Sequence, residues 1–318
     1  MRQKGRAMII CCGEALIDMI PSVDAAGKDA FTPHAGGAVF NTAVALGRLG
    51  APVGFVSGIS TDLFGDMLRQ GLTDSNVDTA NVVMSDRRST LAFVTLKNGQ
   101  ASYLFFDENS AGRMLDAKDL PTIPDATTAL YLGGISLINL PAADFYVALA
   151  MREAGRRVIM ADPNIRMNFV TDETAYRARL ERLIAHTNIL KVSDEDLDWI
   201  VPGPLSMLEK ADMLLNRGPQ LVIVTRGSQG ATGLFGTDGV VEVPAQSTTV
   251  ADTVGAGDTF NAGVLARLSE QGLLSTDALQ NITGEQVASA LAMGAKVAGI
   301  TVSRHGANPP WAHELDGA

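Results

Sequence analysis

The chain has 318 residues, and its 35 acidic against 25 basic side chains give a formal net charge of −10. This acidic balance disfavours a nucleic-acid or anionic-membrane surface, because both partners need a basic face. Hydrophobic residues make up 46% of the chain and charged residues 19%, which supplies a core and excludes general disorder. The two cysteines, Cys11 and Cys12, are adjacent. That spacing excludes a disulfide framework and a C-x-x-C metal site, and favours a reducing, cytoplasmic compartment.

Short apolar runs alternate with longer amphipathic segments along the chain. The runs predict strands at Met8–Cys12, Val53–Ser57, Ala129–Leu132, Val158–Ala161, Ile189–Val192 and Leu221–Thr225. The amphipathic segments predict helices at Val39–Leu49, Phe64–Asp74, Ala142–Ala154, Ala175–His186 and Pro204–Asn216. Wholly apolar strands that alternate with helices indicate an α/β fold whose central, mostly parallel sheet is covered on both faces. No apolar run approaches the roughly 18 residues that span a bilayer, so no membrane segment is expected.

One region departs from this alternation. Leu91–Leu96 and Gln100–Phe106 alternate with a period near two around Asn98-Gly99, a pair of residues that favours a two-residue hairpin turn. We assign this hairpin to a small β-sheet lid built from two inserted segments, about 18–34 and 88–108. No repeat or Pro-rich linker separates the lid from the rest, so residues 1–318 are expected to form a single domain.

The strongest chemical signal is Asp-Thr-Val-Gly-Ala-Gly-Asp-Thr-Phe at 252–260, which leads into a segment with helical spacing. A turn of Gly255, Ala256 and Gly257 at a helix start aims backbone N–H groups outward, a setting that holds an anion such as phosphate. Asp258, in the first helical turn, could accept a proton from an attacking hydroxyl. Taken alone, so short a pattern is more typical of an aspartate that complements the helix dipole.

The 252–260 string closely resembles the second signature of the PfkB (ribokinase-like) carbohydrate kinases. Residues 36–50 resemble the first signature of the same family; they read Gly36-Gly37-Ala-Val-Phe-Asn41-Thr-Ala-Val-Ala-Leu-Gly47-Arg-Leu-Gly50. This resemblance, which runs from Met8 to Pro310, implies a ribokinase-like three-layer sandwich with a small β-sheet lid. It also implies ATP as co-substrate with Mg²⁺, Asp258 as catalytic base, and the 255–257 turn as the anion hole for the γ-phosphoryl group. No G-x-x-x-x-G-K-[ST] P-loop occurs, so this turn is expected to recognise the phosphate.

The same resemblance implies which residues bind the sugar. They are Asp18, Gly36, Gly37 and Asn41, together with Asn164 and Arg166 in a segment that follows a strand end. The run from Tyr103 to Arg113 resembles the lid segment of bacterial fructokinases and adds Phe106 and Asn109. The keto-acid kinases of the family tend to carry an Arg shortly after that tyrosine. The apolar Leu-Phe-Phe here favours an uncharged ketohexose, and the resemblance to fructokinases implies D-fructose phosphorylated at its 6-hydroxyl. Arg166 leaves a 2-keto-3-deoxygluconate kinase or another PfkB sugar kinase open.

The resemblance also implies which residues bind the nucleotide. They are Lys191, Ser193, Thr225, Arg226, Gly227, Gly230 and Asn308. Ser193 and Asp196 replace the Asn and Glu of the family pattern, so Asp196 is expected to act on Mg²⁺ through water. A monovalent-cation loop, for potassium, is implied near Asp252, Val254 and Val302.

Two further function classes and one partner have to be weighed. A non-catalytic sugar or nucleotide sensor on a kinase scaffold is disfavoured by the intact Gly-Ala-Gly-Asp segment. A dinucleotide-binding oxidoreductase is disfavoured because no G-x-G-x-x-G follows the first predicted strand.

Relatives often pair through their lids, whose sheets otherwise expose edges and apolar surface. A homodimer through the lid is therefore expected.

Overall fold

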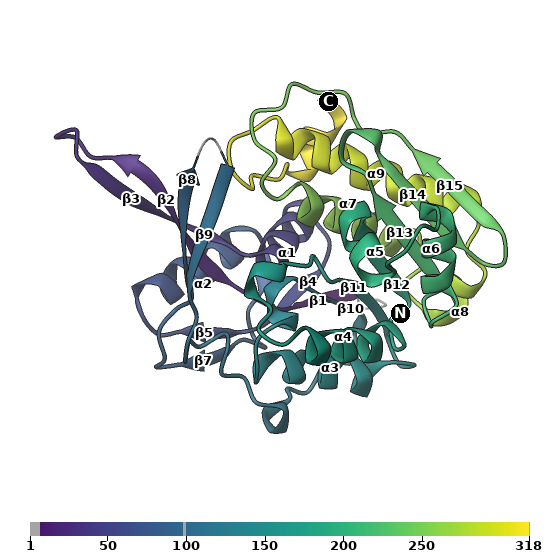
Figure 1. The fold of residues 1–318 in the computed structure, drawn as a ribbon, viewed down its shortest axis with the longest axis horizontal. Helices are drawn as coiled ribbons and strands as arrows, with labels where there is room; N and C mark the ends of the chain where they lie inside the picture. Colours follow the sequence, from purple (N-terminus) through teal and green to yellow (C-terminus); the bar gives the residue numbers. More distant parts are fainter. Residues whose placement is uncertain (1–6, 98–99, 318) are drawn as a thin grey trace, which may run out of the picture.

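The computed structural model describes residues 7–97 and 100–317. The predicted Asn98-Gly99 turn lies outside these residues. Within them, a nine-stranded sheet has the order β15-β14-β13-β12-β11-β10-β1-β4-β6, and a four-stranded sheet, β3-β2-β8-β9, projects from one side of it (Figure 1). A further pair joins β5 (Gly58–Ser60) to β7 (Val83–Ser85).

Seven neighbouring strands of the main sheet are parallel. They are β1 (Met8–Cys12), β4 (Val53–Val56), β6 (Val77–Asp78), β10 (Thr127–Gly133), β11 (Val158–Asp162), β12 (Ile189–Ser193) and β13 (Leu221–Thr225). The antiparallel β14 (Ala231–Phe235) and β15 (Gly239–Val243) extend the sheet at one edge. All six runs predicted as strands form strands here, because Val, Ile and Leu suit a pleated surface that is buried on both faces.

Helices cover both faces of the main sheet. One face carries α1 (Ala38–Arg48), α2 (Leu63–Asp74), α7 (Ala256–Glu270), α8 (Thr276–Gln280) and α9 (Gly284–Val302). The other carries α3 (Ala142–Glu153), α4 (Glu173–Ile184), α5 (Asp194–Ile200) and α6 (Met207–Leu215). Short 3₁₀ turns are η1 (Ala117–Asp119), η2 (Gly134–Leu137), η3 (Met167–Phe169), η4 (Gly227–Gln229) and η5 (Ala312–Gly317).

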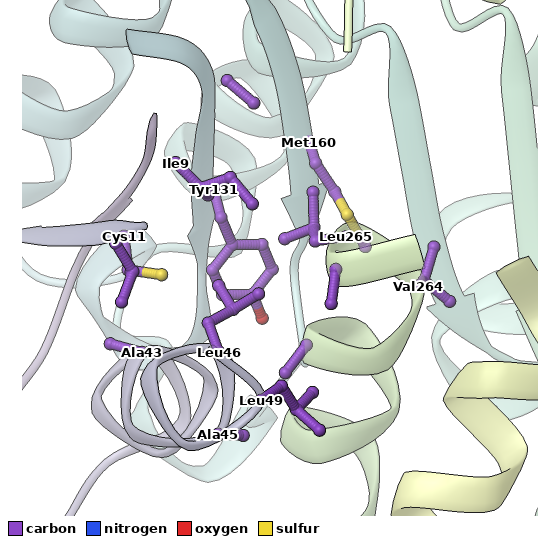
Figure 2. Close-up of a cluster of buried hydrophobic side chains, with 14 of the residues drawn as sticks. Ile9, Cys11, Ala43, Ala45, Leu46, Leu49, Tyr131, Met160, Val264 and Leu265 are labelled. Atoms are coloured by element: carbon purple, nitrogen blue, oxygen red, sulfur yellow. The ribbon is translucent and has the colours of Figure 1, made fainter. Parts of the chain in front are cut away.

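The two helical layers enclose two separate cores. Alternate residues of a strand point to opposite faces, so Ile9 of β1 enters one core and Ile10 enters the other. Figure 2 shows the first core, where Tyr131 of β10 lies close to Leu46 of α1 and Leu265 of α7. The predicted fold class, a three-layer α/β sandwich with a small β-sheet lid, is confirmed.

The lid consists of β2 (Leu16–Val23), β3 (Asp29–Gly36), β8 (Leu91–Lys97) and β9 (Gln100–Phe106). Its β8–β9 pair is antiparallel, as the alternation predicts, whereas β2 pairs with β8 in parallel. Chain connectivity fixes where the lid stands, since β2 follows β1 closely and β3 leads directly into α1. The lid therefore rises at the carboxyl end of the parallel strands. No helix of the described ranges is long and apolar enough to cross a membrane. That residues 1–318 form a single domain stays a prediction.

Candidate active site

A cavity of about 350 Å³ lies at the carboxyl ends of the parallel strands, between the lid and the first turns of α1 and α7. Open α/β sheets bind their ligands at this edge. Many residues singled out from the sequence line it: Asp18, Gly37, Asn41, Asn164, Arg166, Lys191, Val254, Gly255, Ala256, Gly257 and Asp258. The fold thus brings the predicted sugar-side and phosphate-side residues to one place.

Helix α7 begins at this cavity without a side-chain cap. Its N-cap residue, Gly255, has a φ of 76°, and a Cβ atom there would lie 2.7 Å from the Cβ of Ala307. Glycine suits both the left-handed backbone and the close approach. The first amides of a helix have no partner within the helix, so this end presents N–H donors and a partial positive charge to the cavity.

Six of the seven described α-helices that start outside the cavity lining differ in this respect, the exception being α3, whose N-cap residue is Pro141. Their N-cap side chains accept a hydrogen bond from the first turn in α2, α4, α5, α6, α8 and α9, through Asp62, Asp172, Ser193, Ser206, Ser275 and Thr283. Such caps stabilise a helix by about 1 kcal/mol. Helix α7 forgoes that stabilisation where an anion could take the place of the cap.

Asp258 lies in the first turn of α7 and is only 8% exposed. Asn41 Nδ2 donates a hydrogen bond of 2.9 Å to its Oδ2, and the Thr42 hydroxyl donates one of 3.0 Å to its backbone oxygen. Burial raises the pKa of Asp258 to about 7, an effect that the nearby Asp162 charge reinforces and the Asn41 hydrogen bond opposes. A carboxyl group that titrates near neutrality suits a general base.

A buried ion pair lies next to this helix start. Lys191 Nζ donates to Asp162 Oδ2 at 2.9 Å, and Asn261 Nδ2 donates to the same oxygen at 2.7 Å. A Cβ atom on Gly257 would lie 3.4 Å from Lys191 Nζ, which places the ammonium beside the first turn of α7. Of the amides in that turn, the one of Ala256 donates to the Thr253 carbonyl at 3.3 Å. Sequence reasoning did not single out Asp162 and Asn261. The sequence features that could have identified them are their places in the motifs: Asp162 opens the Asp-Pro-Asn-Ile-Arg segment, and Asn261 is the polar residue directly after Thr259-Phe260.

The sugar-side residues sit at the base of the lid. Burial raises the pKa of Asp18, on β2, to about 6, and a Cβ atom on Gly36 would clash with the Asp18 carboxylate. Asn164 and Arg166 approach from the loop after β11, where the Arg166 guanidinium donates to the Ile165 carbonyl at 3.0 Å. Asn109, by contrast, is exposed and does not line the cavity.

The predicted sugar contact of Phe106 needs correction. Phe105 lines the cavity, and Phe106 lies on the other face of the lid, with its ring 5.6 Å from that of Phe93. Successive strand residues point to opposite faces, and Phe105 shares its face with Asp18 through their common neighbour Ala92. The ring of Phe105 lies 4.5 Å from that of Phe169.

Most of the predicted nucleotide residues lie further along the same edge of the sheet. Ser193 and Thr225 pair at the ends of β12 and β13, and the turn after β13 has positive φ angles at Gly227 (50°) and Gly230 (94°). The Arg226 guanidinium donates to the Thr232 hydroxyl at 3.1 Å. Asn308 Oδ1 accepts from Arg48 at 2.8 Å, near the C-terminal end of α1. Of the predicted nucleotide residues, Lys191 lines the main cavity.

The replacements at Ser193 and Asp196 have a structural explanation. The Ser193 hydroxyl accepts from the Asp196 amide at 3.0 Å, and Asp196 reaches back to the Ser193 amide, so the two residues form a capping box for α5. Asp196 Oδ1 also accepts from the Ile165 amide at 3.1 Å. The carboxylate is buried and lies outside the cavity lining, and its action on Mg²⁺ through water stays a prediction.

Asp252, Val254 and Val302 come together, and backbone amides already bind the oxygen atoms of Asp252 and Val302. The Asp252 carboxylate accepts from the amides of Val254 (3.0 Å) and Gly306 (2.9 Å). The Val302 carbonyl accepts from the amides of Ala251 (2.8 Å) and Asp252 (3.2 Å). Across 7–97 and 100–317, no three His, Cys, Asp or Glu side chains are grouped so as to hold a metal ion.

Comparisons with known proteins agree with this geometry. The family model described as "pfkB family carbohydrate kinase" matches residues 6–314. The chain is 51% identical over 269 residues to a fructokinase of Rhizobium leguminosarum bv. trifolii, an alignment that covers 84% of this chain and 82% of the relative.

Solved structures of fructokinases have the same fold. An ATP-bound fructokinase from Xylella fastidiosa superposes with a TM-score of 0.88 at 27% identity, covering 98% of both chains. A fructokinase double mutant from Vibrio cholerae O395, with fructose, ADP and potassium ion bound, superposes with a TM-score of 0.82 at 25% identity, covering 96% of this chain and 95% of that one. The chain belongs to the pfkB family of carbohydrate kinases.

Proposed function

We propose that this protein is an ATP-dependent fructokinase that transfers the γ-phosphoryl group of ATP to the 6-hydroxyl of D-fructose. The observation that carries the proposal is the placement of Asp258. Its buried carboxyl group, with a pKa of about 7, stands at the uncapped start of α7 and opens onto the same cavity as Asp18 and Asn41. Similarity to fructokinases from several organisms supports the substrate.

In this proposal, the Asp258 carboxylate accepts the proton of the 6-hydroxyl as that oxygen attacks the γ-phosphorus. The bond from the γ-phosphorus to the β–γ bridging oxygen breaks, and ADP leaves with that electron pair. The turn at Gly255, Ala256 and Gly257 faces the transferring group with N–H donors, and Lys191 adds a positive charge beside them. A positioned base contributes about 10²–10⁴ in rate, and loss of one oxyanion donor costs about 10²–10³.

Replacement of Asp258 by Asn tests the role of the base. The amide can still accept a hydrogen bond from Asn41, but it cannot take a proton, so turnover should be lost with little loss of fructose binding. Calorimetric titration with fructose, run beside a coupled ADP-release assay, separates the two effects. Turnover retained at the wild-type rate would remove Asp258 as the base.

The cavity wall bears on the choice of sugar. The ring of Phe105 lines the cavity and packs against that of Phe169 behind it, an apolar part of the wall that suits an uncharged ketohexose. The Arg166 guanidinium also lines the cavity and favours the second candidate, a 2-keto-3-deoxygluconate kinase, since it could pair with a substrate carboxylate. A coupled assay with fructose, ribose, 2-keto-3-deoxygluconate and adenosine decides between them, and preference for any of the last three refutes fructose.

Mg²⁺ is proposed as the metal that accompanies ATP. Four acidic side chains (Glu14, Asp18, Asp162 and Asp258) but only two basic ones (Arg166 and Lys191) line the cavity. The negative charge of a polyphosphate would be repelled by this acidic lining unless positive charge were added, and a divalent cation would supply that charge. Bound to the phosphates, Mg²⁺ would neutralise part of their charge, and Asp196 would hold it through water. Activity should disappear with EDTA and return with Mg²⁺.

Potassium is proposed as a monovalent cation at Asp252, Val254 and Val302. The bound potassium ion of the Vibrio cholerae fructokinase supports this proposal. Exchange of potassium for sodium at constant ionic strength should then lower kcat.

We also propose a homodimer in the cytoplasm. Phe31, Leu104 and Phe106 are exposed on the lid, and the rings of Phe31 and Phe106 both contact Phe93. Contiguous apolar surface of this kind is typical of protein–protein contacts. A monomer in analytical sedimentation at micromolar concentration would contradict the dimer. Two buried free cysteines fit a reducing compartment.

A further inference from the structure

Glu14 is a buried carboxylate at the junction of β1 and β2 for which the proposed reaction has no direct use. Its side chain is 9% exposed, and no ion pair within 7–97 and 100–317 includes it. Instead, Oε1 accepts from the Ala38 amide at 3.0 Å and Oε2 from the Ser136 amide at 3.2 Å. Burial raises its pKa, so its charge is costly where it stands.

The contact with Ala38 replaces a cap that α1 cannot supply itself. The N-cap residue of α1 is Gly37, with a φ of 109°, and a Cβ atom there would lie 3.0 Å from the Glu14 carbonyl oxygen. The capped helices elsewhere carry an Asp, Ser or Thr at this position. In α1 the accepting oxygen comes from a residue 24 positions earlier in the chain.

The surrounding backbone keeps room for this carboxylate. Gly134, at the start of η2, has a φ of 66°, and a Cβ atom there would overlap Glu14 Oε1. The neighbouring Ser136 amide holds the second oxygen. Glu14 therefore joins three elements, the β1–β2 junction, η2 and the first turn of α1, and it lines the main cavity together with Gly37 and Ala38.

The first turn of α1 carries the residue that contacts the catalytic base. The Asn41 amide donates to the Gly37 carbonyl at 2.8 Å, which closes that turn, and Asn41 Nδ2 reaches Asp258 Oδ2 at 2.9 Å. If the turn frays, this side chain moves relative to Asp258. The cap at Ala38 and the contact at Asp258 are thus only one helical turn apart.

We propose that Glu14 is a positioning residue that caps helix α1 in place of the side chain Gly37 lacks, and thereby holds Asn41 against Asp258. This inference rests on the proposed kinase function of Asp258. A positioning role predicts that the effect of Glu14 on turnover passes through Asn41. A role in folding alone predicts no such dependence.

A double-mutant cycle measures this dependence. Glu14→Gln keeps the size of the side chain but turns one accepting oxygen into a donor that faces a backbone amide. We expect it to lower kcat about tenfold in the wild-type background and about twofold or less when Asn41→Ala is already present, because residues in one network are not additive. The KM for ATP should stay within about twofold, since Glu14 acts on the base side of the cavity.

Two further variants separate position from charge and from stability. Glu14→Asp keeps the charge but is one methylene shorter, so it should reproduce the loss of kcat; it also serves as the test variant if Glu14→Gln does not fold. Asp172→Ala removes the cap of α4, which accepts from Ala175 at 2.9 Å away from the cavity. It should lower the unfolding temperature and leave kcat unchanged.

The outcomes are distinct. The positioning role would be overturned if Glu14→Gln lowered kcat by the same factor with and without Asn41→Ala, or if it left kcat unchanged. A loss of kcat in Asp172→Ala as large as that in Glu14→Gln would overturn it too. If the active protein prefers another sugar, the cycle runs with that sugar and still tests Glu14. A wild-type protein that transfers no phosphoryl group would refute the proposed function itself.

Discussion

Asp258→Asn should make the folded protein more stable as well as inactive. Asp258 is 8% exposed, and its pKa is about 7 in the folded chain against an ordinary value of 3.8. Because the pKa of Asp258 is higher in the folded chain than in the unfolded chain, binding of its proton favours the folded state. This contribution to the free energy of unfolding is fully present below the unfolded pKa and is lost as the pH rises through about 7. Near pH 8 the folded chain therefore carries a buried charge that the unfolded chain would solvate freely.

The expected magnitude follows from these two pKa values. Between about pH 5.5 and about pH 8, the wild-type chain should lose about 2 kcal/mol of unfolding free energy through Asp258 alone. The asparagine has no proton to lose and retains the hydrogen bond from Asn41, provided that its oxygen faces that donor. The variant should therefore lack this part of the pH dependence.

Urea denaturation of the ligand-free protein at both pH values is the assay. The difference in unfolding free energy between variant and wild type should increase by about 2 kcal/mol from the lower to the higher pH. Asp18, with a raised pKa of about 6, contributes equally to both proteins and cancels in this difference. Equal pH dependence of the two proteins would show that Asp258 is not a buried group of raised pKa, and the argument for its role as base would fail.

Three further predictions concern the same site. The value of kcat/KM for fructose should fall about tenfold from about pH 7 to about pH 6 as Asp258 takes up its proton, and a first inflection below about pH 5 would contradict this. Gly255→Ala should abolish turnover and destabilise the protein by more than Gly272→Ala. Both glycines have a positive φ, but only the first would crowd a neighbour, so equal losses in urea denaturation would refute the crowding argument. Phe105→Ala should raise the KM for fructose about tenfold, whereas Phe106→Ala should leave that KM unchanged and weaken self-association in sedimentation; the reverse pattern would contradict the strand register.

Local sequence was enough to predict the elements that meet at the site. The apolar runs at β1 and β13 predicted buried parallel strands because such runs fit only a sheet covered on both faces. The Gly-Ala-Gly-Asp segment predicted a helix start that presents backbone N–H groups, since small residues leave room for an anion. The structure adds that the N-cap is left-handed and has no side-chain cap. The predicted properties depend on neighbours within a few residues, which the sequence shows directly.

Contacts between distant segments had to wait for the tertiary structure. Asn41 meets Asp258 across 217 positions, and Asp162 gathers Lys191 and Asn261 from two other elements. The assignment of the sugar-facing aromatic to Phe106 was wrong because the face of each β9 residue depends on the register of β9 with β8 and of β8 with β2. The sequence by itself determined the α/β class and the chemistry of the glycine turn. Packing decided which carboxyl group is buried enough to act as a base at neutral pH, because desolvation arises only when remote segments close around it.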